Sequence, residues 1–261
     1  MTIIFEKEKN IARITLNRPD VHNAFNAQMI ADLNTAFEDL ENSSNVDVVI
    51  ISGNGASFSA GADLEWMKLA ATFNYEKNVK DAMMLSNMLN SFYSLKQLTV
   101  VCAKGAIMGG GVGLVSCADV AIADQDSKFA FSEVKLGLIP ATISPFVIKA
   151  IGARQSKRYF QTGEIFDAEK ALQIGLVHET STSIDDLDEM LETMLYCINK
   201  NAPTAMKEAK KLVLDYQSST ISDDLRGDTA IRIAKVRSSM EAIEGLTAFL
   251  DKRDPDWKRD V

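Results

Sequence analysis

Four glycines separate an apolar run from a helix-like segment in the stretch IMGGGVGLVSCAD, residues 107–119. A glycine costs about 0.5–1 kcal/mol inside a helix or strand, so a run of four needs a structural reason. The run lacks the Lys–Ser/Thr pair of a P-loop and the GxGxxG spacing of a dinucleotide site. It predicts a strand that turns into a helix whose first backbone N–H groups are free to bind an anion. Close packing of the helix against a neighbour is the alternative explanation.

Apolar runs typical of strands alternate with segments of helical periodicity before this stretch and just after it. We expect strands at residues 2–5, 11–16, 46–53, 98–105, 119–124 and 128–131. We expect helices at 26–43, 63–70 and 78–95, with Asn26 as the N-cap of the first. From Ile143 onward the pattern is almost wholly helical, at 144–152, 167–175, 184–200, 203–216 and 240–253. This order predicts an α/β core followed by a helical C-terminal part.

The charge balance argues against one class of partner. The 261 residues carry a net charge of −8 and no basic stripe, whereas nucleic-acid binding relies on clustered lysine and arginine. The three cysteines form no CxxC pair and there are only two histidines, so we expect a reducing compartment and no metal site. Because no signal-like or membrane-length apolar run is present, we expect a cytoplasmic protein that does not bind a membrane.

A second turn of small residues follows another buried strand, in VVIISGNGASFSAGADLEWM at residues 48–67. Asp63 suits the N-cap of the helix that comes next. Two such turns on adjacent parallel strands would aim two backbone N–H groups at one point, as an oxyanion hole requires. Neither turn contains the GxSxG of a serine hydrolase, so that chemistry is disfavoured.

Glu133, in SKFAFSEVKLGLIPA, is the candidate acid/base. If residues 128–133 are extended, Glu133 shares a face with Phe129 and Phe131. A carboxylate on an apolar face has a raised pKa, which suits proton transfer near neutral pH. The alternative is that the strand ends at Ser132 and that Glu133 meets solvent.

Three stretches taken together resemble the enoyl-CoA hydratase/isomerase (crotonase) superfamily: FSAGADL, residues 105–140, and FDAEKALQIGLVHE. The resemblance runs from ITLNRP to AFLDKR. It implies a crotonase-like α/β spiral of ββα units at residues 1–200 and a helical C-terminal trimerisation region at 201–261. It also implies a homotrimer or dimer of trimers that acts on acyl-CoA thioesters, with no cofactor beyond the coenzyme A of the substrate.

The resemblance also assigns roles to residues at matching positions. The N–H groups of Ala62 and Gly110 would form the oxyanion hole, and Glu133 would be a catalytic glutamate. The positions implied to contact coenzyme A are Ala24, Ala60, Asp63, Phe249 and Lys252, the last two reaching the nucleotide from a neighbouring subunit.

Two features depart from the pattern of hydratases that use two glutamates. The first glutamate would fall at Gly113, which has no side chain for acid/base work. Asp20 and His22 stand where a lysine and an apolar residue are common near coenzyme A. A narrower similarity is to bacterial methylglutaconyl-CoA hydratases of leucine degradation, which also lack the first glutamate; it is carried by GADLEWMK, GGVGLVSCADVAIA and SEVKLGLIPATISPFVIKAIG.

The leading hypothesis is therefore an enoyl-CoA hydratase, a hydro-lyase whose chemistry depends on Glu133. A Δ3,Δ2-enoyl-CoA isomerase fits a single carboxylate equally well, and room for a water beside Gly113 would separate the two. A non-catalytic acyl-CoA-binding trimer is a third possibility. Lys68 is a candidate cation for the second carboxylate of methylglutaconyl-CoA, although a solvated helix lysine is the better explanation of that residue.

Overall fold

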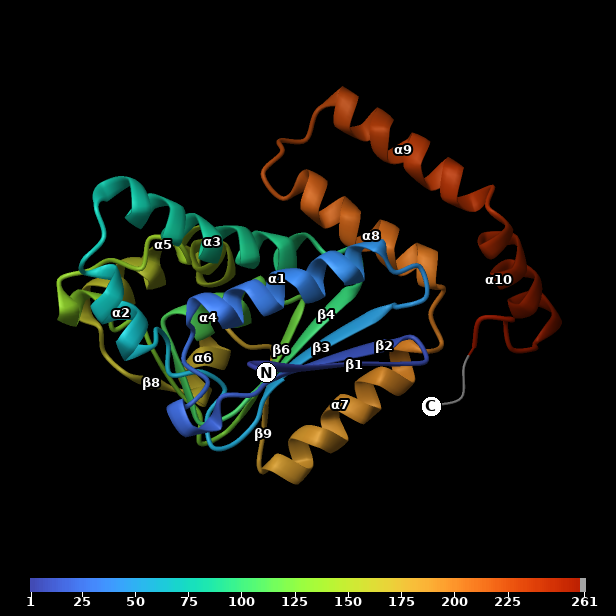
Figure 1. Cartoon of the computed structure of the whole chain (residues 1–261). Coiled ribbons are helices and arrows are strands. Elements are labelled where there is room, and N and C mark those ends of the chain that lie inside the picture. The colour runs from blue at the N-terminus through green and yellow to red at the C-terminus, as the bar shows by residue number, and fades with distance from the viewer. Residues whose placement is uncertain (259–261) are drawn as a thin grey trace. The chain divides into compact units, whose positions relative to one another are not determined.

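A computed structural model describes residues 1–258 (Figure 1). The chain divides into two compact units, an α/β unit at Met1–Glu189 and a helical unit at Met190–Val261. The boundary expected from the resemblance, between residues 200 and 201, stays a prediction. No helix within the described residues is long and apolar enough to cross a membrane.

A six-stranded sheet in the order β1-β2-β3-β4-β6-β9 forms the centre of the first unit. Its strands are β1 (Ile3–Glu8), β2 (Ile11–Leu16), β3 (Val48–Gly53), β4 (Leu98–Ala103), β6 (Val120–Asp124) and β9 (Glu179–Ser181). Strands β1 and β2 pair antiparallel, as the expected N-terminal hairpin, and the other neighbours pair parallel. Five of the six residues of β3 are buried, because both faces of the sheet are covered.

A second, three-stranded sheet has the order β5-β7-β8. It consists of β5 (Ala106–Met108), β7 (Lys128–Ala130) and β8 (Phe166–Asp167). Strands β5, β8 and β9 were not predicted from the sequence, because strands of two or three residues are too short to show alternation. An isolated parallel bridge between Ser59 and Ile107 joins the loop after β3 to β5. This bridge brings the two glycine turns together.

The helices of the first unit are α1 (Ala27–Asn42), α2 (Leu64–Ala70), α3 (Tyr75–Ser94), α4 (Gly110–Cys117), α5 (Ser144–Thr162) and α6 (Ala168–Gln173). Helix α1 begins at the expected cap, since the Asn26 side chain accepts a hydrogen bond from the Met29 N–H. Helices α1 and α3 lie together over the sheet in Figure 1. The Phe37 and Phe92 rings stack between them with centroids 5.2 Å apart. Helix α7 (Ile184–Ile198) runs through the boundary between the units.

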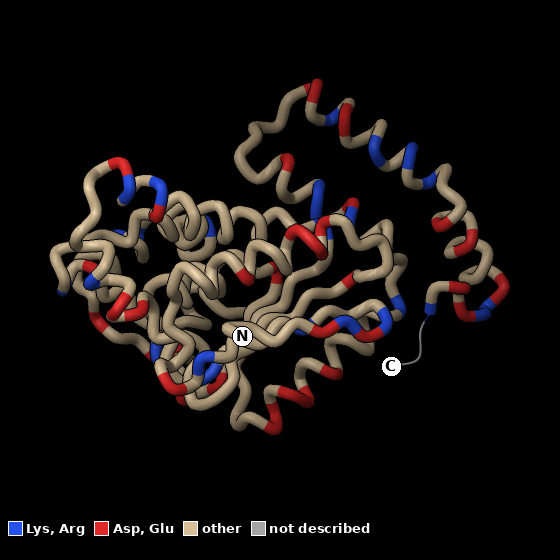
Figure 2. The backbone as a smooth tube through the Cα atoms, in the orientation of Figure 1, with Lys and Arg blue, Asp and Glu red and all other residues tan. Residues whose placement is uncertain are grey.

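The second unit contains α8 (Pro203–Tyr216), α9 (Asp223–Arg237) and α10 (Met240–Asp251). Sequence analysis missed α9, because the segment DDLRGDTAIRIAKVR has no one-sided apolar stripe and buries none of its residues. Arg232 of α9 pairs with Asp215 of α8 and with Asp228 of its own helix. Basic and acidic residues are interspersed along α9 in Figure 2.

Candidate active site

The two glycine turns predicted from the sequence lie against each other. Phe25 bridges to the first turn: its N–H donates to the Gly61 carbonyl at 2.7 Å, and its carbonyl accepts from the Asp63 N–H at 2.8 Å. A Cβ placed on Gly61 would lie 3.3 Å from the carbonyl oxygen of Met108, and one on Gly109 would lie 3.9 Å from the Gly61 Cα. The sequence suggested that the two turns follow adjacent parallel strands of one sheet. The structure differs, because the first turn follows β3 of the six-stranded sheet and the second follows β5 of the three-stranded sheet.

The backbone N–H groups of Ala62 and Gly110 are open at this junction. Among the described residues, neither group has a hydrogen-bond acceptor. Ala62 is exposed and Gly110 half-buried, so a ligand can reach both donors. Gly110 is the first residue of α4, where the helix dipole adds partial positive charge. Free donors of this kind suit an oxygen that gains negative charge.

Gly109 explains why this turn needs glycine. Its φ of 47° lies in the left-handed region, which residues other than glycine rarely adopt. A Cβ at this position would also lie 3.1 Å from Oε1 of Glu133. The missing side chain therefore allows the turn to form and leaves space for a carboxylate next to the two donors.

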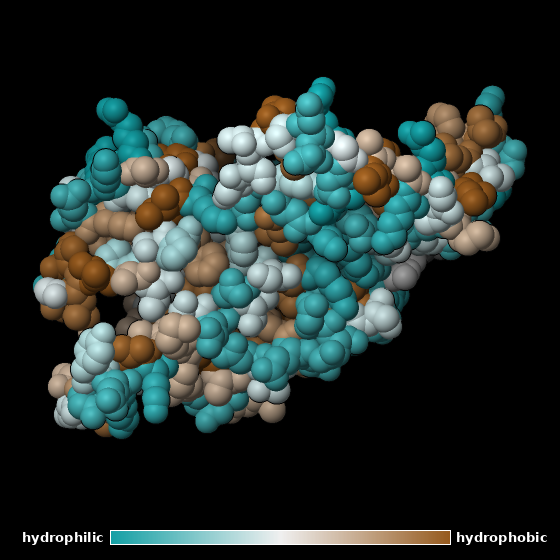
Figure 3. Space-filling model, turned by 90° about the horizontal axis from the view of Figure 1, so that it is seen from above, coloured by the Kyte–Doolittle hydropathy of each residue, from teal (hydrophilic) through white to brown (hydrophobic). Residues whose placement is uncertain are grey.

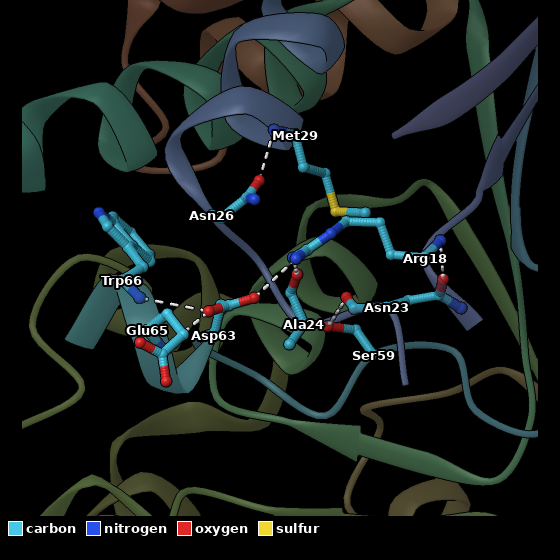
Figure 4. A network of polar contacts seen from close by, with 9 residues as sticks. All are labelled: Arg18, Asn23, Ala24, Asn26, Met29, Ser59, Asp63, Glu65 and Trp66. Atoms are coloured by element: carbon cyan, nitrogen blue, oxygen red, sulfur yellow. Dashed lines mark hydrogen bonds and ion pairs between the residues drawn. The ribbon is translucent and has the colours of Figure 1, made fainter. Parts of the chain in front are cut away.

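Arg18 holds the first turn in place through the network drawn in Figure 4. Its Nη2 donates to Oδ2 of Asp63 at 2.7 Å, and its Nη1 donates to the Ala24 carbonyl at 2.5 Å. Asp63 also caps α2, as predicted, by accepting from the N–H groups of Glu65 and Trp66. Pattern analysis missed Arg18, because nothing in the sequence links position 18 to position 63.

The electrostatics of Asp63 follow from this network. Burial by itself raises the pKa of the carboxyl, but hydrogen bonds from Arg18 and from the N–H groups of Trp66 and Glu65 outweigh it. The net pKa is below the ordinary value of an aspartate, so Asp63 is ionised near neutral pH. It acts as an anchor for the turn and is not a proton donor.

Glu133 reaches the site by a different route from the one expected. Strand β7 ends at Ala130, and Glu133 begins a short 3-10 helix, Glu133–Leu136. The expectation of an extended segment that places Glu133 on the face of Phe129 and Phe131 was therefore wrong. The alternative was wrong as well, since the turn directs the half-buried side chain toward Gly109 instead of into solvent.

The Glu133 carboxyl group is poised to exchange a proton. Its Oε2 is buried and has no hydrogen-bond partner in the part of the chain that the structure describes. Burial raises the pKa of Glu133, and a hydrogen bond from its own backbone N–H opposes that shift. A carboxyl group with a raised pKa and an unused oxygen suits general acid/base chemistry.

The space beside Gly113 is closed. A Cβ on Gly113 would lie 2.6 Å from Cγ2 of Ile143 and 3.4 Å from Cδ1 of Leu89. The Ile143 and Leu89 side chains are buried and apolar. The position therefore holds neither a second carboxylate nor a polar partner for a water. The contact between Ile143 and Gly113 could not be predicted from the sequence.

The other predicted contacts with coenzyme A are spread over both units. Ala24 is buried and Ala60 exposed, and the Ala60 N–H donates to the His22 carbonyl at 2.9 Å. Phe249 and Lys252 are exposed at the end of α10, in the second unit. Their roles in binding stay predictions.

Two further residues from the sequence analysis have local partners. His22 lies 3.1 Å from the Ser57 hydroxyl through Nδ1, and Asp20 is exposed. Lys68 is exposed and pairs with Glu65 at 2.5 Å, which agrees with a solvated helix lysine.

Within residues 1–258 no group of three or more His, Cys, Asp or Glu side chains is arranged to bind a metal. The absence of a metal from the reaction stays a prediction.

Hydrophobic side chains gather on one side of the first unit (Figure 3). In Figure 3, hydrophobic groups border a hollow at the left of the view, the side on which α2, α3 and α5 lie in Figure 1. Exposed hydrophobic residues follow both Asp63 and Glu133 in the chain: Leu64, Leu69, Leu136, Leu138 and Ile139. A surface of this kind suits an apolar ligand group or a protein partner.

Comparisons with known proteins agree with this geometry. The family model described as enoyl-CoA hydratase/isomerase matches residues 6–260. The chain is 30% identical over 246 residues to a putative enoyl-CoA hydratase of Thermus thermophilus, covering 94% of this chain and 96% of that protein.

Solved structures agree as well. A putative enoyl-CoA hydratase/isomerase (crotonase) of Legionella pneumophila is 40% identical, with a TM-score of 0.93 and 98% of each chain covered. An enoyl-CoA hydratase of Shewanella pealeana is 37% identical, with a TM-score of 0.94 and coverages of 98% and 96%. The expected α/β crotonase fold is confirmed, and the chain belongs to the enoyl-CoA hydratase/isomerase family.

Proposed function

We propose that this chain adds water across the C2=C3 double bond of a 2-enoyl-CoA, with Glu133 as its only catalytic carboxylate. One observation carries the proposal: the carboxyl group of Glu133, whose Oε2 has no hydrogen-bond partner among the described residues, lies beside Gly109, at the junction that holds the N–H groups of Ala62 and Gly110. A base next to a pair of oxyanion donors is the arrangement that chemistry at C2 and C3 of a thioester requires.

The proposed steps use only these groups. The Ala62 and Gly110 N–H groups donate to the thioester oxygen and draw electrons from the double bond. Glu133 takes a proton from a water as its oxygen bonds to C3, and the π electrons pass to the thioester as an enolate. The enolate re-forms the carbonyl while C2 takes the proton back from Glu133. Each oxyanion donor contributes about 3–4 kcal/mol to stabilising this charge.

We propose methylglutaconyl-CoA as the substrate, on the strength of the subgroup similarity in GADLEWMK and in the segment that follows Glu133. Lys68 does not help this assignment, because its ammonium group pairs with Glu65. The relatives from Thermus thermophilus and Shewanella pealeana carry hydratase names, which favours hydration as the reaction. We further propose that the substrate's coenzyme A is the only cofactor and that the protein works as a trimer or a dimer of trimers.

Isomerisation of a 3-enoyl-CoA to a 2-enoyl-CoA is the second candidate. It is favoured by the closed space beside Gly113, where Ile143 and Leu89 leave no place for a water. Here Glu133 would take a proton from C2, the electrons would pass to the thioester as a dienolate, and C4 would receive the proton. No water is consumed.

A panel of CoA esters tests both candidates. Crotonyl-, 3-methylcrotonyl-, methylglutaconyl- and 3-hexenoyl-CoA would be incubated with the enzyme, and the absorbance of the conjugated thioester followed. Hydration removes this absorbance from the 2-enoyl esters, and isomerisation of 3-hexenoyl-CoA creates it. Turnover of methylglutaconyl-CoA faster than of the others supports the full proposal. No change with any ester would contradict both reactions.

A further inference from the structure

Ile143 occupies the volume that a side chain at position 113 would need. A Cβ on Gly113 would lie 2.6 Å from the Cγ2 and 3.2 Å from the Cβ of Ile143. Real Cβ contacts are essentially never shorter than 3.0 Å. Only 2% of the Ile143 surface is exposed, so the side chain has little room to move away.

A single chain segment places both Glu133 and Ile143 against helix α4. Glu133 begins the 3-10 helix Glu133–Leu136, and Ile143 is the N-cap of α5. Oε1 of Glu133 faces Gly109 at the start of α4, and Ile143 faces Gly113. The Gly113 N–H donates to the Gly109 carbonyl at 3.1 Å, so the two contacts are about one helical turn apart, a rise of about 6 Å over four residues.

The wall next to Glu133 is therefore dry. A water needs two to four polar partners and about one probe sphere of free volume. The nearest atoms of Ile143 and Leu89 at this place are all aliphatic carbons. A water that attacks a bound enoyl group must approach from another side of Glu133.

We infer that Ile143 is a specificity-determining residue, which sets the balance between hydration and isomerisation by keeping water away from the wall beside Gly113. The inference rests on the proposed chemistry of Glu133. In hydration the enzyme bonds one water oxygen to C3 and one proton to C2. In isomerisation the C2 proton leaves and C4 gains one. A smaller and polar side chain at position 143 opens space for a water and offers it a hydrogen-bond partner, which favours the first outcome.

The contact itself is tested by stability. Gly113→Ala adds a methyl group that collides with Ile143, so we expect it to lower the Tm of the wild-type chain. In an Ile143→Ala background, where the colliding methyl groups are gone, we expect Gly113→Ala to leave the Tm unchanged or to raise it. An equal drop in both backgrounds would show that Ile143 does not fill this space and would overturn the inference.

The product balance tests the function. The enzyme would be given 3-hexenoyl-CoA in D2O, and three readouts taken: deuterium at C2, 2-hexenoyl-CoA and 3-hydroxyhexanoyl-CoA. We expect Ile143→Ser to raise the ratio of hydroxyacyl to isomer product about tenfold, the scale on which small changes in a pocket shift discrimination. Ile143→Thr, with a larger branched side chain, should give a smaller increase in this ratio, and it replaces the serine variant in the test if that variant does not fold. Ile151→Ala, a buried truncation farther along α5, should keep the wild-type ratio.

The possible failures are distinguishable. An Ile143 variant that exchanges C2 protons but keeps the wild-type product ratio overturns this inference and leaves the role of Glu133 intact. A wild-type enzyme that exchanges no C2 proton of any ester contradicts the proposed function, and the inference falls with it.

Discussion

Arg18 and Asp63 form an ion pair that is mostly shielded from solvent, with Nη2 and Oδ2 2.7 Å apart and side-chain exposures of 21% and 10%. The same guanidinium holds the Ala24 carbonyl, and the same carboxylate caps α2. The pair therefore ties the backbone at Ala24 to the first glycine turn, in which Ala62 precedes Asp63. The direction of the Ala62 N–H depends on this tie, although neither side chain touches the free donor.

Removing Arg18 should weaken both the fold and the catalytic step. Arg18→Gln leaves the Asp63 carboxylate without its cation, which should lower the free energy of unfolding by about 2–3 kcal/mol. Because the first turn is then free to shift, we expect kcat to fall about tenfold or more. Urea unfolding and steady-state kinetics at a temperature well below Tm measure the two effects. Arg158→Gln, in an exposed pair with Glu164, is the control and should leave both readouts close to wild type. A stability loss at unchanged kcat would contradict a positioning role.

Glu133→Gln should abolish turnover and keep substrate binding. The amide preserves the shape of the side chain but cannot accept a proton, so we expect kcat to fall at least about 100-fold. The Kd for a CoA ester, measured by calorimetry, should change little. Glu164→Gln, an exposed glutamate paired with Arg158, should behave as wild type. Retention of more than about a tenth of the wild-type kcat would exclude Glu133 as the only base.

The same substitution should stabilise the protein at neutral and alkaline pH. Burial raises the pKa of Glu133, so the ionised form is less favourable in the folded chain than in the unfolded one. The stability linked to this group is fully present below its unfolded pKa of about 4.3 and is lost as pH rises through the raised folded value. The Tm of Glu133→Gln should therefore exceed that of wild type near pH 8, with the difference shrinking toward pH 4. A variant less stable than wild type at both pH values would mean that the carboxylate has a stabilising partner.

Gly110→Pro and Gly110→Ala form a matched pair for the second donor. Both add a Cβ, which would lie 3.0 Å from the Phe25 ring, but only proline removes the N–H. Gly110 has no positive φ, and proline is tolerated in the first turn of a helix, so neither change should distort the turn through φ. We expect kcat of the proline variant to be at least about 100-fold below that of the alanine variant. Equal kcat at equal Tm would show that this N–H is not catalytic.

The exposed apolar residues of α10 should be covered by another copy of the chain. Ile243, Leu246, Phe249 and Leu250 are all exposed in the second unit, and such faces normally pack against a partner. We expect light scattering at micromolar concentration to report a trimer or a hexamer, and Leu246→Glu to shift the mass toward a monomer. A monomeric wild-type protein would contradict the proposed assembly.

Local patterns determined most of the elements. The runs at β2, β3 and β4 and the periodic stripe of α1 each carry their own signal, because a two-residue or 3.6-residue repeat is visible wherever one side of an element is buried. Helix α9 and the strands β5, β8 and β9 carry no such signal. Their conformation depends on neighbours that are distant in the chain, such as Phe129 beside Phe166 across β7 and β8.

The candidate site divides in the same way. The residues of the two glycine turns, the capping of α2 by Asp63 and the choice of Glu133 as the candidate acid/base could all be predicted from the sequence, because turns, caps and residue types are local properties. Three relationships are visible only in the fold: a 3-10 turn brings Glu133 to Gly109, Arg18 reaches Asp63, and Ile143 closes the space beside Gly113. These three relationships join positions that are far apart in the chain, and at such separations contact depends on how the layers pack, which no local repeat records.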